Sequence, residues 1–334
     1  MYTPWSVVVL GCGNIAGGFD QERPEGALPY THAGAYRLHG GFSVLTCVEP
    51  DAERRAAFMR RWSIPAGFSN MAQAVAAGVR ADVVSICTPT ACHAMDLAAV
   101  LASLRPRLVF CEKPVTGSVD ETAALVEQCE RLGVALAVNH NRRWDPALRR
   151  LRDDIRSGRR GSLRSVVGLY NKGILNNGSH MLDLLRFLLG ELDIVSAGQP
   201  VADYSDSDPT LPLTLRGAGG TPIVLACGDA RDFALFELQF VFSSGVVSVE
   251  DGGSRWRERR AVPSADFAGY VALDEGQMAP GGDAECMLAA VDNIHGYLAH
   301  GAELASTGHS ALAAQRLCEQ ARQMAQILIS KHTE

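Results

Sequence analysis

A glycine-rich turn near the amino terminus has the composition of a phosphate-binding loop. The run Gly11-Cys12-Gly13-Asn14-Ile15-Ala16 directly follows an apolar, strand-like segment, Ser6–Leu10. The first glycine permits a tight turn, and the second lets the backbone approach a pyrophosphate. The helix that we expect to start at this motif would add free N–H groups and a positive dipole end. Because the motif comes after the first strand of an alternating pattern, it is interpreted as a dinucleotide-binding loop.

An acidic residue at the end of the second strand-like run is suited to bind the adenosine ribose. Glu49 can accept hydrogen bonds from both ribose hydroxyls and would repel a 2′-phosphate, so we expect NAD, with NADP less favoured. Its distance from the glycines exceeds the usual interval of about 20 residues. An insertion-like loop, Phe19–Tyr30, accounts for the excess and is expected to form a partial lid. Arg54 and Arg55 follow on the next helix. Because they could bind a 2′-phosphate, NADP stays an alternative cofactor.

Two further side chains have the chemistry to move a proton and to stabilise negative charge. Lys113 follows the apolar run Leu108–Cys111, at the strand end where open α/β sheets bind ligands, and can hydrogen-bond a reacting oxygen. The imidazole of His180 has an unperturbed pKa of about 6.5, which suits a proton acceptor. Asp183 lies one helical turn later, where it can orient the imidazole or bind a hydroxyl. The competing interpretations are a surface lysine, a histidine at a helix start and a locally paired aspartate.

The elements that carry the first set of residues alternate between strand and helix. This order predicts a parallel sheet covered on both faces. The expected strands are Ser6–Leu10, Phe42–Val48, Val83–Cys87, Leu108–Cys111 and Val134–Val138, and the expected helices are Asp51–Trp62, Met71–Ala77, Ala91–Leu104 and Val119–Leu132.

The pattern changes near Trp144, and strand-like runs separated by Gly, Ser and Asp become frequent. They predict a largely antiparallel sheet, while Tyr204–Pro212 is expected to be an exposed loop. We expect an NAD-binding domain over residues 1–118 and a second domain over residues 119–334, to which the family resemblance given below assigns substrate binding and oligomerisation. The expected helices here are Ala147–Arg156, His180–Leu189, Ala284–Leu298 and Ser310–Ile329, and the expected strands are Leu163–Tyr170, Ile223–Ala226, Ala234–Phe242 and Val246–Glu250.

Composition narrows the function classes. The 334 residues carry a formal net charge of −6, which gives no electrostatic footprint for nucleic acid or an anionic membrane. No apolar run reaches the roughly 18 residues that span a bilayer. The nine cysteines have no metal-ligand spacing, so we expect no metal site and interpret them as buried, reduced thiols of a cytoplasmic protein.

Several motifs in a fixed order give the chain a family resemblance. Beyond the glycine motif and Glu49, the order continues with Thr88-Pro89-Thr90 and His93, Glu112-Lys113-Pro114, Asn141-Arg142-Arg143-Trp144, and Gly178-Ser179-His180 with Asp183. In this set the chain resembles the Gfo/Idh/MocA oxidoreductases over nearly its whole length. The resemblance implies a Rossmann domain followed by an α/β domain with an open, mostly antiparallel sheet, often used for dimer or tetramer contacts.

The same resemblance implies hydride transfer between nicotinamide and a carbon of a sugar, polyol or nucleotide-linked sugar, within a homodimer or homotetramer. It implies that His180 faces the substrate from the second domain. It also implies a cofactor crevice lined by Gly11, Gly13, Asn14, Ile15, Glu49, Thr88, Pro89, Thr90, His93, Glu112 and Lys113.

One departure from the family concerns the residue four positions before the histidine. Many members have an aspartate there, but this chain has Asn176, which can bind a hydroxyl or an amide and cannot relay a proton. Lys113 is therefore expected to have the larger part in catalysis. The asparagine also makes a nucleotide sugar or an amino sugar a candidate substrate. The arginine pair Arg142 and Arg143 can clamp a phosphate or carboxylate, and Tyr170 is a further candidate substrate contact.

Two alternative functions come from other classes. A glycosidase with a tightly held NAD would oxidise its substrate transiently and accumulate no NADH. A non-catalytic NAD-binding sugar sensor would need no acid or base, and the presence of both Lys113 and His180 argues against it.

Overall fold

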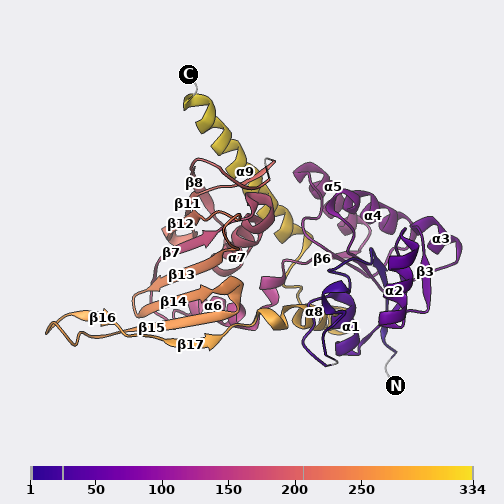
Figure 1. Ribbon diagram of the computed structural model, residues 1–334, viewed down its shortest axis with the longest axis horizontal. Helices are drawn as coiled ribbons and strands as arrows, with labels where there is room; N and C mark the ends of the chain where they lie inside the picture. Colours follow the sequence, from indigo (N-terminus) through magenta and orange to yellow (C-terminus); the bar gives the residue numbers. More distant parts are fainter. Residues whose placement is uncertain (1–2, 25, 206, 333–334) are drawn as a thin grey trace. The chain divides into compact units, whose positions relative to one another are not determined.

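The computed structural model describes residues 3–24, 26–205 and 207–332 (Figure 1). Contacts between residues divide the chain into two compact units. The first consists of Met1–Trp144 with Ala284–Leu312, and the second of Asp145–Asp283 with Ala313–Glu334. Each unit has its own sheet and its own hydrophobic core.

The first unit is built on a six-stranded parallel sheet. The strand order is β3-β2-β1-β4-β5-β6, which confirms the predicted Rossmann arrangement. Helices lie on both sides, so alternate residues of a strand enter different cores: Val7 and Val9 pack in one, Val8 and Leu10 in the other. The strands are β1 (Trp5–Leu10), β2 (Phe42–Val48), β3 (Ala66–Phe68), β4 (Val83–Ile86), β5 (Leu108–Cys111) and β6 (Ala135–Val138).

The helices of the first unit match the predicted alternation. They are α1 (His32–His39), α2 (Ala52–Trp62), α3 (Met71–Ala76), α4 (Thr90–Ser103), α5 (Val119–Arg131) and α8 (Cys286–His300). Side-chain caps begin several of them: Asp51 accepts from the backbone N–H groups of Glu53 and Arg54, and Ser118 accepts from that of Glu121.

The helix expected to start at the glycine motif is absent from its expected place. After Gly13 the chain forms tight turns and a short 3₁₀ segment, Gly18–Asp20, and α1 begins only at His32. Gly17 and Gly18 lie in these turns, and glycine costs about 1 kcal/mol relative to alanine inside a helix. The carboxylate of Asp20 accepts from the backbone N–H groups of Tyr30 and Thr31, which ties the two ends of the intervening loop together.

The first unit extends beyond the boundary expected after residue 118. Strand β6 pairs with β5 in the parallel sheet, and α5 packs in the same core. Helix α8 returns much later in the chain, and its Asn293 accepts a hydrogen bond from the indole N–H of Trp144 at 2.9 Å. The contact-based division therefore differs from the expected one, because the sheet needs one more strand and a distant helix to cover it.

The second unit is built on a nine-stranded sheet in the order β16-β15-β14-β13-β7-β12-β11-β8, with β17 paired to β15. Only β7 and β12 run parallel, as the resemblance implied for a mostly antiparallel sheet. The strands are β7 (Leu163–Tyr170), β8 (Asp193–Ala197), β11 (Leu213–Arg216), β12 (Pro222–Cys227), β13 (Phe236–Phe242), β14 (Gly245–Glu250), β15 (Arg255–Pro263), β16 (Val271–Leu273) and β17 (Gln277–Pro280).

Helices cover one face of this sheet. Apolar side chains of α6 (Pro146–Ser157), α7 (Ser179–Leu189) and α9 (Gly308–His332) share one core with the inward-facing residues of β7, β12 and β13. On β7 the buried residues Val166 and Tyr170 alternate with the exposed Val167 and Leu169. The opposite face of the sheet therefore presents apolar side chains to solvent in the single chain.

The segment Tyr204–Pro212 is only in part the exposed loop that its composition predicts, because Tyr204 and Ser207 are exposed whereas Asp208 and Thr210 are buried. It begins inside β9 (Val201–Ser205) and contains β10 (Asp208–Thr210), and these two short strands pair antiparallel. Asp203, Asp208 and Thr210 are buried because their side chains bond backbone N–H groups of the segment before α7. Their polarity, which indicated a solvated loop, instead serves internal hydrogen bonds.

Candidate functional site

The glycine motif forms a turn that only glycine could make at its first position. Gly11 has a φ of +82°, and a Cβ there would lie 2.8 Å from the carbonyl oxygen of Cys87. At Gly13 a Cβ would meet nothing within 4 Å. The first glycine thus allows close packing against the end of β4, and the second leaves open space beside the backbone, as a bound pyrophosphate requires.

Glu49 lies against this turn. Its carboxylate accepts hydrogen bonds from the backbone N–H of Cys12 at 3.0 Å and from that of Asp51 at 3.1 Å, and only 5% of the residue is exposed. A guanidinium nitrogen of Arg54 lies 3.5 Å from one carboxylate oxygen, and Arg54 also pairs with Asp51. Arg55 donates instead to the carbonyl oxygen of Glu49. The acidic residue predicted to bind ribose is therefore held beside the glycine motif.

The Thr88-Pro89-Thr90 turn joins β4 to α4 and is held in place by side-chain hydrogen bonds. Thr88 donates to the carboxylate of Asp96 at 2.6 Å, and burial raises the pKa of Asp96 above its ordinary value against this hydrogen bond. The ring of His93 bridges two main-chain carbonyl groups, those of Thr88 at 2.8 Å and Pro114 at 2.7 Å. With 1% of its surface exposed, His93 holds two turns together, and the structure leaves it no surface to line a crevice as expected.

A hydrogen-bond network surrounds the carboxylate of Glu112, the residue before Lys113. The carboxylate of Glu112 accepts from His32 Nε2 at 3.0 Å and from Asn139 Nδ2 at 2.7 Å. Because an ionised carboxylate can only accept, His32 Nε2 carries the proton of this bond. The other ring nitrogen, Nδ1, lies 3.2 Å from Ser85 Oγ, and Ser85 in turn bonds the hydroxyl of Tyr36 at 2.8 Å.

These partners keep Glu112 ionised. Burial raises the pKa of its carboxyl group, but the hydrogen bond and charge of His32, the hydrogen bond of Asn139 and the charge of Lys113 outweigh burial and lower it below 4.5. Lys113 itself is half-buried, and the Lys113–Pro114 peptide is cis. The carboxyl ends of β1, β2, β4 and β5 thus bring the glycine motif, Glu49, Thr88 and Lys113 to one edge of one sheet, as predicted.

In the second unit, Asn176 belongs to a π-helical segment, Gly173–Gly178, which leads directly into α7 and His180. Such segments are rare in proteins overall, and those that occur are often found at functional sites. The carboxylate of Asp208 accepts from the backbone N–H groups of Leu175 at 2.8 Å and Asn176 at 3.1 Å. The carbonyl oxygen of Asn176 accepts from Ser179 Oγ at 2.7 Å. The backbone that carries Asn176 is therefore fixed from both sides.

A second carboxylate fixes the start of the same segment. Asp203 accepts from the backbone N–H of Lys172 at 2.9 Å and from Thr210 Oγ1 at 2.7 Å, while Thr210 accepts from the backbone N–H of Gly173. Lys172 has a φ of +67°, an unusual conformation that these bonds support. Asp203 and Asp208 were not predicted as site residues, because the sequence marks them by no more than an acidic run between two strands.

The other residues of the second unit that were expected in the site differ in how far they are exposed. His180 is half-buried, and Asp183 is 1% exposed one turn later on α7. Tyr170, expected to contact substrate, is wholly buried, and its hydroxyl donates to the carbonyl oxygen of Leu211 at 2.6 Å. That expectation is corrected: Tyr170 belongs to the core, because its ring completes the inward face of β7.

The arginine pair lies in a 3₁₀ segment, Asn141–Trp144, of the first unit. Arg143 is 8% exposed and donates to the carbonyl oxygen of Ala305 at 3.2 Å, which supports a structural role over a substrate clamp. Arg142 is half-buried. Across the described residues, no group of three or more His, Cys, Asp or Glu side chains is arranged to hold a metal ion, and no helix is long and apolar enough to cross a membrane.

Comparison with known proteins finds similar sequences and similar structures. Residues 5–140 match the sequence model described as oxidoreductase family, NAD-binding Rossmann fold. D-apiose dehydrogenase of Paraburkholderia graminis is 28% identical over 217 residues, 60% of this chain. Inositol 2-dehydrogenase of Rhizobium meliloti is 26% identical over 277 residues, 74% of this chain. The matches span 57% of the first relative and 79% of the second.

A solved structure shares the fold over almost the entire chain. The WlbA dehydrogenase of Bordetella pertussis, solved with NADH and UDP-GlcNAcA, superposes with a TM-score of 0.73 and 19% sequence identity. The superposition covers 97% of each chain. At this identity the likeness concerns the fold.

Proposed function

We propose that this chain is an oxidoreductase of the Gfo/Idh/MocA family and that it uses NAD to transfer a hydride to or from an alcohol carbon of a sugar, polyol or nucleotide-linked sugar. One observation carries the proposal. The open backbone at Gly13, the carboxylate of Glu49 and the side chain of Lys113 all follow strands at the same edge of the first sheet. Parallel sheets bind dinucleotides at this edge.

The residues present fit NAD. Gly13 leaves room for the pyrophosphate, and Glu49 would bind the adenosine ribose. NAD supplies the hydride acceptor when bound. NADP is disfavoured because Glu49 would repel a 2′-phosphate, while the charge of Arg54 is already compensated by Glu49 and Asp51 and Arg55 is bound to main-chain oxygen.

Lys113 is proposed to act on the reacting oxygen. Its ammonium group would donate a hydrogen bond to the substrate hydroxyl and stabilise the negative charge that develops as the proton leaves. Glu112 precedes it in the chain, and the charge of Lys113 is one of the causes that lower the pKa of the Glu112 carboxyl group. The proton itself is assigned to His180. Asn176 is proposed to bind a substrate hydroxyl or amide group, and the buried Asp183 to orient the imidazole.

The substrate class follows the relatives. Two curated relatives act on an apiose sugar and on inositol, as their names state, and the WlbA structure contains a UDP-linked sugar acid. Asn176 offers both a donor and an acceptor, which matches an N-acetyl group as well as a hydroxyl. We therefore propose polyols, free sugars and nucleotide-linked amino sugars as the compounds to test.

The experiment is a substrate screen followed by one substitution. The wild-type enzyme should produce NADH with at least one compound of these classes. Lys113→Met should lower kcat about a hundredfold or more, because the loss of one preorganised donor to a developing oxyanion has that effect, and should leave NAD affinity nearly unchanged. Arg80→Met, which removes an exposed cation, is the control. Wild-type kcat in the Lys113 variant would contradict the mechanism, and sugar release without NADH would indicate a glycosidase.

A further inference from the structure

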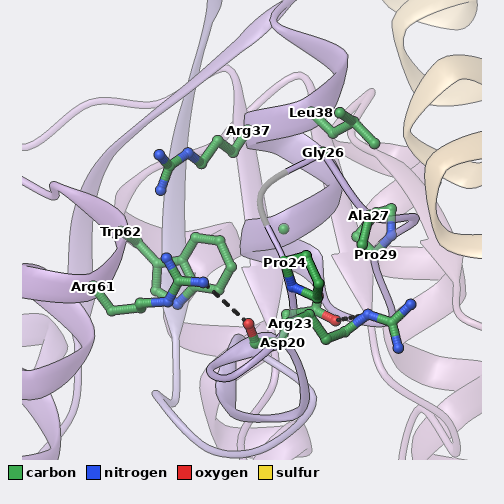
Figure 2. A pocket seen from close by; sticks show the side chains of 11 residues that line it. Asp20, Arg23, Pro24, Gly26, Ala27, Pro29, Arg37, Leu38, Arg61 and Trp62 are labelled. Carbon is green, nitrogen blue, oxygen red and sulfur yellow. Dashed lines mark hydrogen bonds and ion pairs between the residues drawn. The ribbon is translucent and has the colours of Figure 1, made fainter.

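A cavity in the first unit lies between the inserted loop, α1 and α2. It has a volume of about 450 Å³, within the usual range for small-molecule sites. Figure 2 shows that its wall is drawn from three elements: the loop contributes Asp20 and Arg23, α1 contributes Arg37 and Leu38, and α2 contributes Arg61 and Trp62. We call it the loop pocket.

The loop pocket is rich in arginine. Among the described residues that line it there are three guanidinium groups and one carboxylate. The carboxylate of Asp20 is 4% exposed and is already engaged by the backbone N–H groups of Tyr30 and Thr31 and by the hydroxyl of Thr31. The same carboxylate also pairs with Arg23, whose Nε lies 3.6 Å from one of its oxygens (Figure 2).

Two of the arginines are held in defined places. Arg61 donates to the carbonyl oxygen of Asp20 at 3.2 Å, and its guanidinium carbon lies 5.0 Å from the ring centroid of Trp62. Arg23 stacks on Tyr30 with its guanidinium carbon 4.0 Å from the ring centroid. Arg37 projects from the exposed side of α1. A guanidinium fixed in this way loses little freedom when it binds an oxyanion.

We propose that the loop pocket binds a phosphate monoester, such as a phosphorylated sugar. Arginine side chains bind phosphate through charge-assisted hydrogen bonds, and a guanidinium group matches its oxygens in a bidentate arrangement. The volume exceeds that of a phosphate group alone, and Trp62 and Leu38 supply an apolar wall for the organic part of the ligand.

The loop pocket shares a wall with the cavity beside the glycine motif. That smaller cavity, of about 180 Å³, is lined by Gly13 and Asn14 and also by Arg61 and Trp62. Two anions on either side of Arg61 would compete for its charge, so each should weaken binding of the other. This coupling rests on the proposed NAD site, whereas binding to the loop pocket does not.

The test measures binding without NAD. Isothermal titration of the wild-type protein with ribose 5-phosphate should give a saturable signal, and Arg37→Gln or Arg61→Gln should each weaken binding about tenfold, as expected for a lost charge-assisted hydrogen bond. Arg60→Gln is the matched control, because Arg60 is exposed on the same helix and does not line the pocket. Succinate, a dicarboxylate, and inorganic phosphate should both bind more weakly than the sugar phosphate.

Four results would overturn the proposal. They are no saturable binding of ribose 5-phosphate, equal weakening by Arg60→Gln, tighter binding of succinate, or unaltered binding in Arg37→Gln. Arg37 lines the loop pocket but not the smaller cavity, so unaltered binding in Arg37→Gln would place the phosphate beside the glycine motif instead. A saturating concentration of ribose 5-phosphate should then weaken NAD binding about fivefold, at the lower end of common coupling energies. Unchanged NAD affinity would contradict the coupling alone.

Discussion

Replacement of Asp208 tests whether a buried carboxylate positions the segment that carries Asn176. Asp208 accepts hydrogen bonds from two consecutive backbone N–H groups of the π-helical segment, those of Leu175 and Asn176. Asp208→Asn keeps the size of the side chain but presents an NH₂ group to one of these donors. Asp208→Ala removes both acceptors.

The size of the effect follows from these two bonds. A hydrogen bond to a charged partner contributes about 1.5–3 kcal/mol, and a buried donor left without an acceptor costs a similar amount. Asp208 is 8% exposed, so water replaces the lost acceptor poorly. We expect Asp208→Asn to lower the free energy of unfolding by about 1.5–3 kcal/mol and Asp208→Ala by about 3–6 kcal/mol.

The measurements separate local from global effects. Urea unfolding gives the free energy, and hydrogen exchange gives the protection of the amides in Gly173–Gly178 relative to those of the β7 core. Protection in Gly173–Gly178 should fall first in Asp208→Asn, and kcat for an identified substrate should fall more than NAD affinity. Asp266→Asn is the control, since Asp266 is exposed. Unchanged exchange in Gly173–Gly178 would refute the positioning role, whatever the change in global stability.

Three further predictions concern the cofactor, the buried network and the open sheet face. Glu49→Gln should weaken NAD binding about tenfold and reduce the preference over NADP, which calorimetric titration with both cofactors measures; an unchanged preference would contradict the assignment. The lowered pKa of Glu112 means that its ionised form stabilises the fold above pH 4.5 and that this contribution is lost as the pH falls through the folded-state value. Wild type should therefore exceed Glu112→Gln in stability at pH 7, and the difference in urea unfolding should shrink below pH 4.5; a constant difference would exclude this linkage. If a second copy of the chain covers the face that exposes Val167, Leu169 and Val224, then Val224→Glu should lower the mass measured by light scattering, and an unchanged oligomer would place the interface elsewhere.

The features that the sequence predicted are those with a local cause. Short runs of buried Val, Leu and Ile indicated the strands β1, β2, β4, β5 and β6, and each strand was found within a residue or two of its expected bounds. Gly11 was recognised because a tight turn needs its positive φ. Glu49 and Lys113 were recognised because they directly follow strands. Chain order alone brings such residues to one edge of a parallel sheet.

Features that depend on distant contacts were not predictable in this way. The helix expected after the glycine motif is replaced by turns because Asp20 bonds the backbone eleven residues later, at Thr31. The acidic run around Asp208 indicated a solvated loop, since nothing near it in sequence shows that two strands will bury it. Tyr170 was interpreted as a substrate contact because a hydroxyl at a strand end resembles one, but the sheet turns it inward.

The groups that perform chemistry and the groups that hold them differ in how they can be found. Glu112 is part of a recognisable tripeptide, but its partner His32 lies 80 residues away in a segment with no motif of its own. The backbone of Asn176 is held by Asp208, 32 residues away and in a different element. His93 is part of a motif and yet serves as a holder, because both its ring nitrogens face main-chain carbonyl oxygens. A motif thus identifies where chemistry occurs, whereas burial and hydrogen-bond partners decide which of its residues can reach a ligand.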